Sequence, residues 1–388
     1  MRGIKDLRES LTKKYNGDVK KMTEELVNIF TQEIKEKKLD PKQVSFKALF
    51  EGLVDLEGID KNDAVRVAEA VASSSFTQIT TVITSAIIIE PYTQRMVELS
   101  ALFTEGTAKM TNDETVRGMT AVGGVRRRIE TEAYDETDFD EKYVTIRKSD
   151  FGRIIALTME DIFNDATGDI AATANTIGED AISHKEQMVV ETLECLPRTA
   201  FNEATTRAFV YKGTAIVQGG MYASTHVGVA GLDNQVNCNT ATGGVTEAGF
   251  KLAYDNFAKL VDERGKKITI KPKVAIVHST NELVLATLLG TDQVVGSAYN
   301  DINQFGPRGR VQITPFTSVF LATTTGLCYF GDPKRQLLWL DVQKPKTITM
   351  AGTDDDAFRR QIVWKARFNY YGGIGHRDYR YVTRLTTS

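Results

Sequence analysis

The closing part of the chain carries the pattern that most limits the fold. From Ile362 to Tyr370, in IVWKARFNY, apolar or aromatic residues occupy every second position. Successive side chains of a β-strand point to opposite faces, so we predict a strand with one buried and one polar face. Gly372 and Gly373 follow and predict a tight turn before a second short strand. The chain therefore needs a sheet that is covered on one side.

A second strand signal lies at KVAIVH, residues 273–278, whose unbroken apolar run predicts burial on both faces. The helical pattern NELVLATLL follows at once. Ser279 and Glu282 fit the capping pattern S-x-x-E, in which the serine hydroxyl accepts a first-turn amide. A hydrolase that uses Ser279 and His278 is the competing interpretation, but no glycine flanks the serine as a nucleophile elbow requires. We therefore predict a helix cap and no catalytic residue.

Other segments carry helical periodicity. A stretch that opens at Thr158 or Asp161 and runs to Pro197 predicts one helix of about 25 residues. Thr246 is predicted to cap a further helix that ends before Gly265. The first 72 residues also repeat apolar side chains at helical spacing. That region is either a solvated helical layer over a core or an arm that docks on a partner.

The most highly charged segment spans residues 126–157. A basic cluster precedes an acidic run, Glu130 to Glu141, and residues 143–148 then alternate between two faces. This alternation, together with residues 153–157, predicts the two extended arms of a long hairpin. Two strands alone are marginally stable in water, so we expect the hairpin to lie on another surface.

Complementary charges within one segment favour contacts between copies of the chain, although the arginines alone could also contact phosphate. The residues proposed for this subunit interface are Arg126, Arg127, Arg128, Glu130, Asp138, Asp140, Glu141, Arg147, Lys148 and Arg153.

Composition excludes several classes of function. The chain has 48 basic and 51 acidic residues, so their charges nearly cancel. This balance argues against a protein that binds nucleic acid by neutralising its phosphates. The three cysteines lie far apart and predict reduced thiols. Scattered histidines and the run Asp354–Asp356 lack the spacing of zinc or calcium sites, so we expect no metal and no cofactor. The apolar run Val82–Ile89 is far shorter than the roughly 20 residues of a membrane span.

The order of these parts resembles the major capsid proteins of tailed bacteriophages, including Mu-like head subunits, which share the Hong Kong 97-like fold with encapsulins. The resemblance covers the chain from about residue 76 onward. The stretches that carry it are DFGRIIALTMEDIFNDATGDIA, YASTHVGVAGLDN, KPKVAIVHSTNELVLATLL and IVWKARFNYYGGIGHRDYRYVTRL.

The resemblance implies an α+β fold of the Hong Kong 97-like type. The implied parts are a helical extension at 1–75, an N-terminal arm at 76–118, an extended loop at 119–157, a peripheral domain with a long spine helix at 158–204, an apical domain at 205–340 and peripheral return strands at 341–388.

The resemblance also implies a structural role rather than an enzyme. Copies of the chain would form pentamers and hexamers of an icosahedral shell around double-stranded DNA, bound without sequence specificity and without a membrane. Scaffolding, portal and decoration proteins are the expected partners. Assembly in the host cytoplasm would place the chain in the virion capsid. An encapsulin-like protein compartment is the alternative within the same fold, and no residue can be matched to a lysine-to-asparagine cross-link.

Overall fold

The computed structural model of the chain divides into two compact units. Unit 1 comprises Met1–Met96, Asp150–Ser183 and Gln343–Tyr371, and unit 2 the remainder. The structure describes residues 74–110, 113–119, 141–158, 160–161, 169–195, 208–211, 214–217, 222, 236–239, 244–262, 266–293, 302–324, 326–351 and 362–386, with isolated positions between 25 and 36. Before residue 73, where helices are predicted, the described positions 25, 28, 29, 32 and 33 are helical and position 36 lies in a turn, and the other residues there lie outside the described set.

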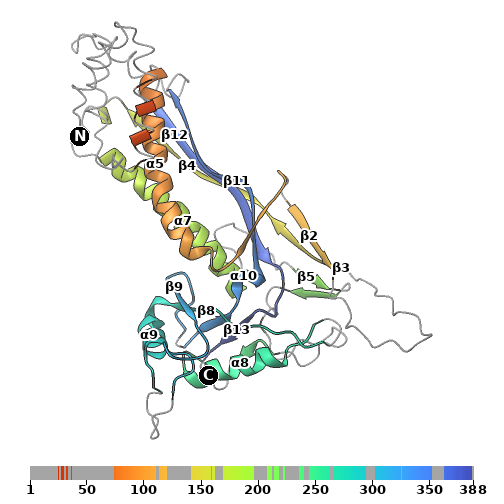
Figure 1. Cartoon of the computed structure of the whole chain (residues 1–388). Helices are drawn as coiled ribbons and strands as arrows, with labels where there is room; N and C mark the ends of the chain where they lie inside the picture. The colour runs from red at the N-terminus through yellow and green to blue at the C-terminus, as the bar shows by residue number, and fades with distance from the viewer. Residues whose placement is uncertain are drawn as a thin grey trace, which may run out of the picture. The chain divides into compact units, whose positions relative to one another are not determined.

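Unit 1 is built on a sheet in which β12 lies between β11 and β4. Figure 1 shows two long helices on one side of these strands. The elements are α5 (Ser74–Leu99), β4 (Ser149–Thr158), α7 (Asp169–Glu194), β11 (Leu337–Ala351) and β12 (Ile362–His376), and each has at least one residue in unit 2. The predicted alternation of β12 is confirmed, because Ile362, Trp364, Ala366, Phe368 and Tyr370 are all buried.

The two helices of unit 1 approach each other closely. A side chain at Gly178 of α7 would meet the ring of Pro91 at 2.8 Å and the carbonyl of Ile88, both in α5. Ile83, Ile87 and Ile88 are fully buried. The segment assigned to an N-terminal arm thus begins with a helix, and its Ile-rich face supplies part of the core.

The predicted long helix is confirmed in α7, which has 26 residues. Its beginning is later than predicted, at Asp169. Thr158 and Asp161 do form a reciprocal cap: the Asp161 amide donates to the Thr158 hydroxyl at 3.2 Å, and the Thr158 amide donates to the Asp161 carboxylate at 3.0 Å. That cap belongs to the helical residues 160–161, which precede α7.

Unit 2 contains a five-stranded sheet of order β7-β13-β10-β8-β9. Its strands are β7 (Cys238–Asn239), β8 (Val274–His278), β9 (Thr314–Ser318), β10 (Cys328–Gly331) and β13 (Val382–Leu385). Every residue of β8 is buried, as its apolar run predicts. β9 ends at Ser318, and residues 319 and 320 form a turn.

Helices α8 (Glu247–Lys259), α9 (Glu282–Gly290) and the short α10 (Pro333–Gln336) also belong to unit 2. Phe250 of α8 stacks on Phe330 of β10 with ring centroids 4.5 Å apart. Thr246 caps α8 as predicted, since its hydroxyl accepts the Gly249 amide at 3.1 Å. The aromatic face of α8 therefore covers one side of the five-stranded sheet.

A third sheet, of order β2-β3-β5-β6, and a parallel pair of β1 with β11 complete unit 2. The strands are β1 (Thr104–Thr107), β2 (Asp113–Met119), β3 (Glu141–Arg147), β5 (Ala208–Tyr211) and β6 (Thr214–Val217).

The hairpin predicted from residues 143–148 and 153–157 has the wrong pair of strands. β3 pairs antiparallel with β2, whereas β4 joins β12. Only Lys148 lies between β3 and β4, which leaves no room for the two-residue loop of a tight hairpin. Alternation identifies a strand but not its partner. The hairpin arms are β2 and β3, and residues 120–140 between them lie outside the described residues.

The tight turn predicted at Gly372 and Gly373 is also wrong, because β12 continues through both to His376. A side chain at Gly372 would lie 2.8 Å from the Leu340 carbonyl, and one at Gly373 would overlap the Arg147 carbonyl. These glycines allow neighbouring backbone to approach the strand, which is the other common reason for glycine in a sheet.

The predicted capping box at Ser279 and Glu282 is wrong as well. Residues Ser279–Asn281 form a 3₁₀ turn, and α9 begins only at Glu282. The His278 ring takes the capping role, since its Nδ1 accepts the Thr280 amide at 3.1 Å. An unprotonated imidazole nitrogen is a hydrogen-bond acceptor, as a hydroxyl oxygen is. With this nitrogen engaged in the turn, the hydrolase interpretation gains no support.

Candidate assembly surfaces

Most of the residues proposed for a subunit interface cannot be placed. Arg126, Arg127, Arg128, Glu130, Asp138 and Asp140 lie outside the described residues. Glu141 begins β3, and Arg147 ends it with an exposed side chain. Arg153 of β4 is exposed, and its guanidinium lies 3.4 Å from the Asp180 carboxylate of α7. Their role in subunit contacts stays a prediction.

Lys148 differs from its exposed neighbours because it is buried within its own chain. Its side chain has no exposed area, and its ammonium lies 2.7 Å from the Glu114 carboxylate. The same ammonium donates to the Lys109 carbonyl at 2.6 Å. This charge is therefore balanced inside unit 2.

Sequence reasoning missed the broad polar side of the sheet in unit 1. We call the side of β4, β12 and β11 that faces away from α5 the outer face. Along β11, Thr349 contacts Thr81 of α5, whereas the alternate residues are exposed. These exposed side chains are Lys344, Lys346, Ile348 and Met350. Since side chains alternate along a strand, this set points to the outer face.

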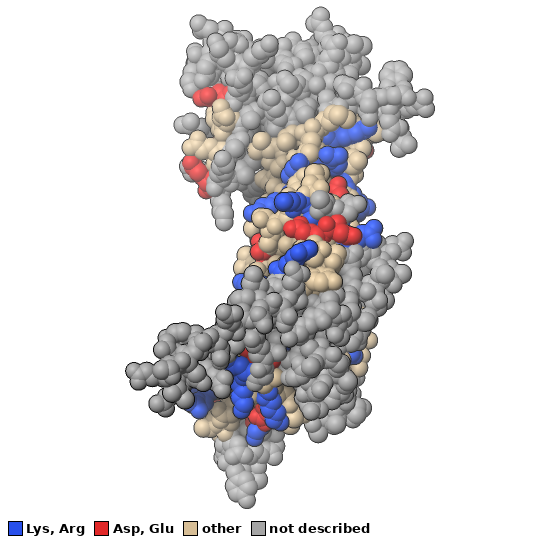
Figure 2. Space-filling model, turned by 90° about the vertical axis from the view of Figure 1, so that its right-hand side faces the viewer, with Lys and Arg blue, Asp and Glu red and all other residues tan. Residues whose placement is uncertain are grey.

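The other two strands extend the outer face. Tyr370 of β12 contacts Tyr92 of α5, so its neighbours Asn369 and Arg367 lie on the opposite side. The Asn369 amide donates to the Asp150 carboxylate of β4 at 3.3 Å across that side. Figure 2 looks onto this side of the molecule and shows Lys and Arg side chains there, with Asp and Glu side chains between some of them.

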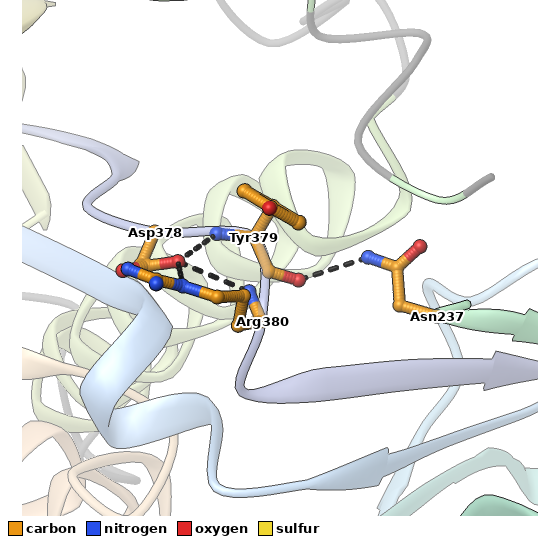
Figure 3. A network of polar contacts seen from close by, with 4 residues as sticks. All are labelled: Asn237, Asp378, Tyr379 and Arg380. Carbon is orange, nitrogen blue, oxygen red and sulfur yellow. Dashed lines mark hydrogen bonds and ion pairs between the residues drawn. The ribbon is translucent and has the colours of Figure 1, made fainter. Parts of the chain in front are cut away.

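A network of polar groups fixes the turn between β12 and β13 in unit 2. The Asp378 carboxylate accepts the Tyr379 amide at 2.7 Å and the Arg380 amide at 3.1 Å, and it pairs with the Arg380 guanidinium at 2.5 Å (Figure 3). Asn237 donates to the Tyr379 carbonyl at 2.8 Å. Asp378, Arg380 and Asn237 are all buried. The run HRDYRY thus has an architectural role, because it ties the last strand to the β7 segment.

Lys185 of α7 is a further buried cation in unit 2. Its ammonium lies 4.2 Å from the centroid of the Trp339 ring and 5.3 Å from that of Phe103. Burial lowers the pKa of Lys185 to about 8, and the charges of Asp341 and Glu105 oppose that shift. Ring faces stabilise a cation that has lost its water, so the Trp339 and Phe103 rings help to accommodate the charge.

Cys195 and His376 lie close together but do not form an activated pair. Cys195 lies 3.6 Å from the His376 ring, but burial raises the pKa of its thiol to about 12. His376 Nε2 donates to the Thr192 carbonyl at 2.7 Å, which engages the nitrogen nearest the sulfur. A thiol must lose its proton to act as a nucleophile. Cys195 is therefore a half-buried and poor nucleophile, and Cys328 and Cys238 also have free thiols whose pKa is raised by burial.

The described part of the chain contains no group of three or more metal-ligating side chains. None of its helices combines the length and apolar character needed to cross a bilayer.

Comparison with families of known proteins identifies the kind of protein that carries these surfaces. Residues 141–385, well over half of the chain, match the family model described as phage capsid protein. The chain belongs to the phage capsid protein family. The match covers the long helix, the five-stranded sheet and the strands of the outer face, and no curated protein matches the chain. Membership places this capsid protein among structural shell subunits rather than enzymes, and in the virion capsid.

Solved structures of capsids are also similar to this capsid protein. The capsid of a native GTA particle is 10% identical, with a TM-score of 0.48, and covers 77% of this chain and 91% of its own. The capsid of Ralstonia phage GP4 is 9% identical, with a TM-score of 0.47, and covers 74% and 87%. A chain from a structure of Mycobacterium phage Cain is 11% identical, with a TM-score of 0.43. The match covers 75% of this chain and 90% of that chain. The family match alone carries the functional conclusion.

Proposed function

We propose that this chain is the major capsid subunit whose copies close into an icosahedral shell around the double-stranded DNA of a tailed phage. The single observation that carries the proposal is the match of residues 141–385 to the phage capsid protein family. The mixed α+β architecture agrees with it. Shell formation follows from that family, whereas the packaged DNA and the host cytoplasm as the place of assembly are proposals.

The surfaces of the molecule support self-association. A monomeric enzyme concentrates its special chemistry in one cleft. Here the described side chains offer instead a broad charged sheet face, and α9 leaves Leu283 and Val284 exposed at 80% and 51%. Exposed apolar side chains of this kind mark protein contacts. A structural subunit needs such contacts and no reactive group.

The implied division into parts becomes a proposal for the assembly. Of residues 119–157, assigned to the extended loop, the part between β2 and β3 lies over a neighbouring copy, whereas β4 belongs to the chain's own sheet. The region 205–340, as the apical domain, meets its copies around the five-fold and six-fold axes of pentamers and hexamers. Residues 1–75 act as an added helical segment. Scaffolding, portal and decoration proteins bind the completed shell or its precursor.

Electron microscopy of negatively stained, purified full-length chain tests the proposal. We expect closed shells or capsomer rings, with an interface of thousands of square ångströms per subunit. A chain that stays monomeric at high concentration would overturn it. Nuclease-resistant double-stranded DNA in particles from infected cells separates a phage head from a protein compartment, which would contain protein cargo instead.

We further propose that the shell is held without covalent cross-links. A denaturing gel of mature particles then shows one band at the subunit mass of 43.0 kDa. A ladder of multimers that survives reducing agent would contradict this.

A further inference from the structure

We propose that the cavity beside α8 in unit 2 is a binding site for a nucleoside phosphate. The cavity has a volume of about 770 Å³ and lies where α8 meets residues 271–273, before β8, and residues 304–312, before β9. Sites that bind small molecules usually enclose about 300–1,000 Å³. The proposal goes beyond the shell function and does not depend on it.

Cationic side chains reach the cavity from each of these segments. Lys251 belongs to α8, Lys271 precedes β8 and Arg310 precedes β9. All three are exposed, and within the described part of the chain none of them forms an ion pair. Lys273 also lines the cavity, but its ammonium lies 3.0 Å from the Asp332 carboxylate. Lysine and arginine side chains are the usual protein ligands of phosphate groups.

Two carboxylates make a bare inorganic anion a poor ligand for this cavity. Glu247 and Asp255 lie one turn before and one turn after Lys251 on α8, and both line the cavity. Among the described residues, neither has an ion pair. A carboxylate only accepts hydrogen bonds, so a ligand that fits must offer donors as well as negative charge. The amino group of a base and the hydroxyls of a sugar are such donors.

The cavity also has an apolar part. Phe305, Pro272 and Val311 line it, together with the ring of Tyr254, which is 39% exposed. Phe305 packs edge-on against Phe250, with ring centroids 5.5 Å apart. Aromatic side chains bind bases through their flat faces. A base can therefore lie against these side chains while its phosphates reach the cations.

The loop that forms one wall is held by its own hydrogen bonds. The Asn303 carboxamide donates to the Thr291 carbonyl at 3.0 Å and accepts the Phe305 amide at 3.0 Å. The Gln304 carbonyl accepts the Val311 amide at 3.2 Å, which closes the loop. A wall that is already ordered loses little conformational freedom when a ligand binds.

An acidic peptide or DNA would also satisfy the cations, but each fits the cavity less well. Peptides bind mostly along the free edge of a sheet or in a groove between helices. This cavity lies at the beginning of β8 and β9 instead of along their length, which favours a compact ligand. Double-stranded DNA keeps its bases stacked inside the duplex, so it cannot place one against Tyr254.

Isothermal titration calorimetry of the purified full-length chain with adenosine triphosphate (ATP), in buffer without magnesium, tests the proposal. We expect saturable binding that is roughly tenfold weaker in Lys271→Ala with Arg310→Ala, because two charge-assisted contacts are lost. The matched control is Lys266→Ala with Lys267→Ala, which removes two exposed lysines of unit 2 that do not line the cavity. Circular dichroism checks that each variant folds. A wild-type chain without saturable binding overturns the proposal, and so does equal binding by the two double variants.

Photo-crosslinking of the unsubstituted chain with 8-azidoadenosine triphosphate is a measurement that needs no variant. We expect the label in peptides that contain Tyr254 or Phe305, and an excess of ATP should prevent the labelling. A label confined to other parts of the chain overturns the proposal.

Competition experiments identify the class of ligand. Inorganic triphosphate should displace ATP roughly tenfold less well than unlabelled ATP does, because it lacks the base. Equal displacement would mean that the base is not recognised and would overturn the nucleoside assignment. A hexaglutamate peptide or a DNA duplex that displaces ATP better than ATP itself would assign the cavity to that class instead.

The outcomes also keep this site apart from the shell function. Normal shells from a chain that does not bind ATP overturn the ligand site alone. A chain that binds ATP in the cavity but forms no shell overturns the shell function alone.

Discussion

Charged side chains have opposite environments in two regions of the molecule. At the turn after β12, the buried Asp378 and Arg380 satisfy each other, and the carboxylate also accepts two backbone amides. On the outer face of unit 1, Lys346 and Arg367 stand exposed on neighbouring strands with no ion pair among the described residues. The first arrangement serves the fold of one chain. The second contributes little to that fold and leaves its charge exposed to solvent.

The difference gives a criterion for separating structural charges from interface charges. A buried charge must be paired or stabilised by its surroundings, because removing it from water is costly. An exposed charge can be lost with little change in stability. Variants that remove charges of each type should therefore separate into effects on unfolding and effects on assembly.

The largest effect is expected for Asp378→Ala. It leaves the Arg380 guanidinium buried without its carboxylate and removes the acceptor of two amides, so we expect a loss of about 4 kcal/mol in the free energy of unfolding. Urea denaturation of the full-length chain measures it. Asp292→Ala, which removes an exposed partner of Arg308, serves as the control and should change stability by less than about 0.5 kcal/mol. Equal losses of stability in the two variants would mean that the buried and the exposed carboxylate contribute alike to the fold.

The next largest effect is expected in the pH dependence of the free energy of unfolding, and Lys185 is its source. Its pKa is about 8 in the folded chain, below the ordinary value of 10.5, so the unfolded chain binds more protons between these values. Stability should therefore rise with pH, by about 2 kcal/mol from pH 7.5 to 10. The measurement is the difference between wild type and Lys185→Met, which cancels other titrating groups. A constant difference over this range would mean that the ammonium is not destabilised by burial.

The adjacent residues Lys148 and Arg147 provide a smaller test of the same contrast. Lys148→Ala leaves the Glu114 carboxylate without its buried partner and should cost about 2 kcal/mol of stability. Arg147→Ala removes an exposed side chain and should cost less than about 0.5 kcal/mol. Thermal unfolding of both variants compares them. A larger loss for Arg147→Ala would reverse the assignment of the two residues.

The smallest effect on stability is expected on the outer face. Arg367→Ala should change the free energy of unfolding by less than about 0.5 kcal/mol, because its side chain is exposed. Assembly should nevertheless weaken, which sedimentation of particles against subunit concentration would detect. Unchanged assembly would mean that Arg367 is a surface charge with no role in contacts between subunits.

Local patterns predicted several elements correctly. The apolar run of β8, the alternation of β12, the cap at Thr246 and the length of α7 all follow from periods and caps that operate within a few residues. The alternation also contained an unused signal. Lys148 falls in the same set as the buried Val144 and Ile146, so its position two residues beyond Ile146 already indicated the buried side.

Features that depend on distant partners could not be predicted from the chain. Nothing within β3 shows that it pairs with β2 rather than β4. The role of Gly373 depends on the Arg147 carbonyl, more than 200 positions away along the chain. The outer face likewise exists only when β4, β11 and β12 are side by side. Its charges are unremarkable along the sequence because the sheet alone gathers them.

The burial of the native thiols has a consequence for the life of the particle. A virion leaves a reducing cell and meets dissolved oxygen, where accessible thiolates are oxidised. Burial raises the pKa of Cys195 and Cys328, and more modestly that of Cys238, so little thiolate is present near neutral pH. The shell should therefore age in air without gaining disulfides. Its mechanical properties would then be independent of the redox conditions it passes through.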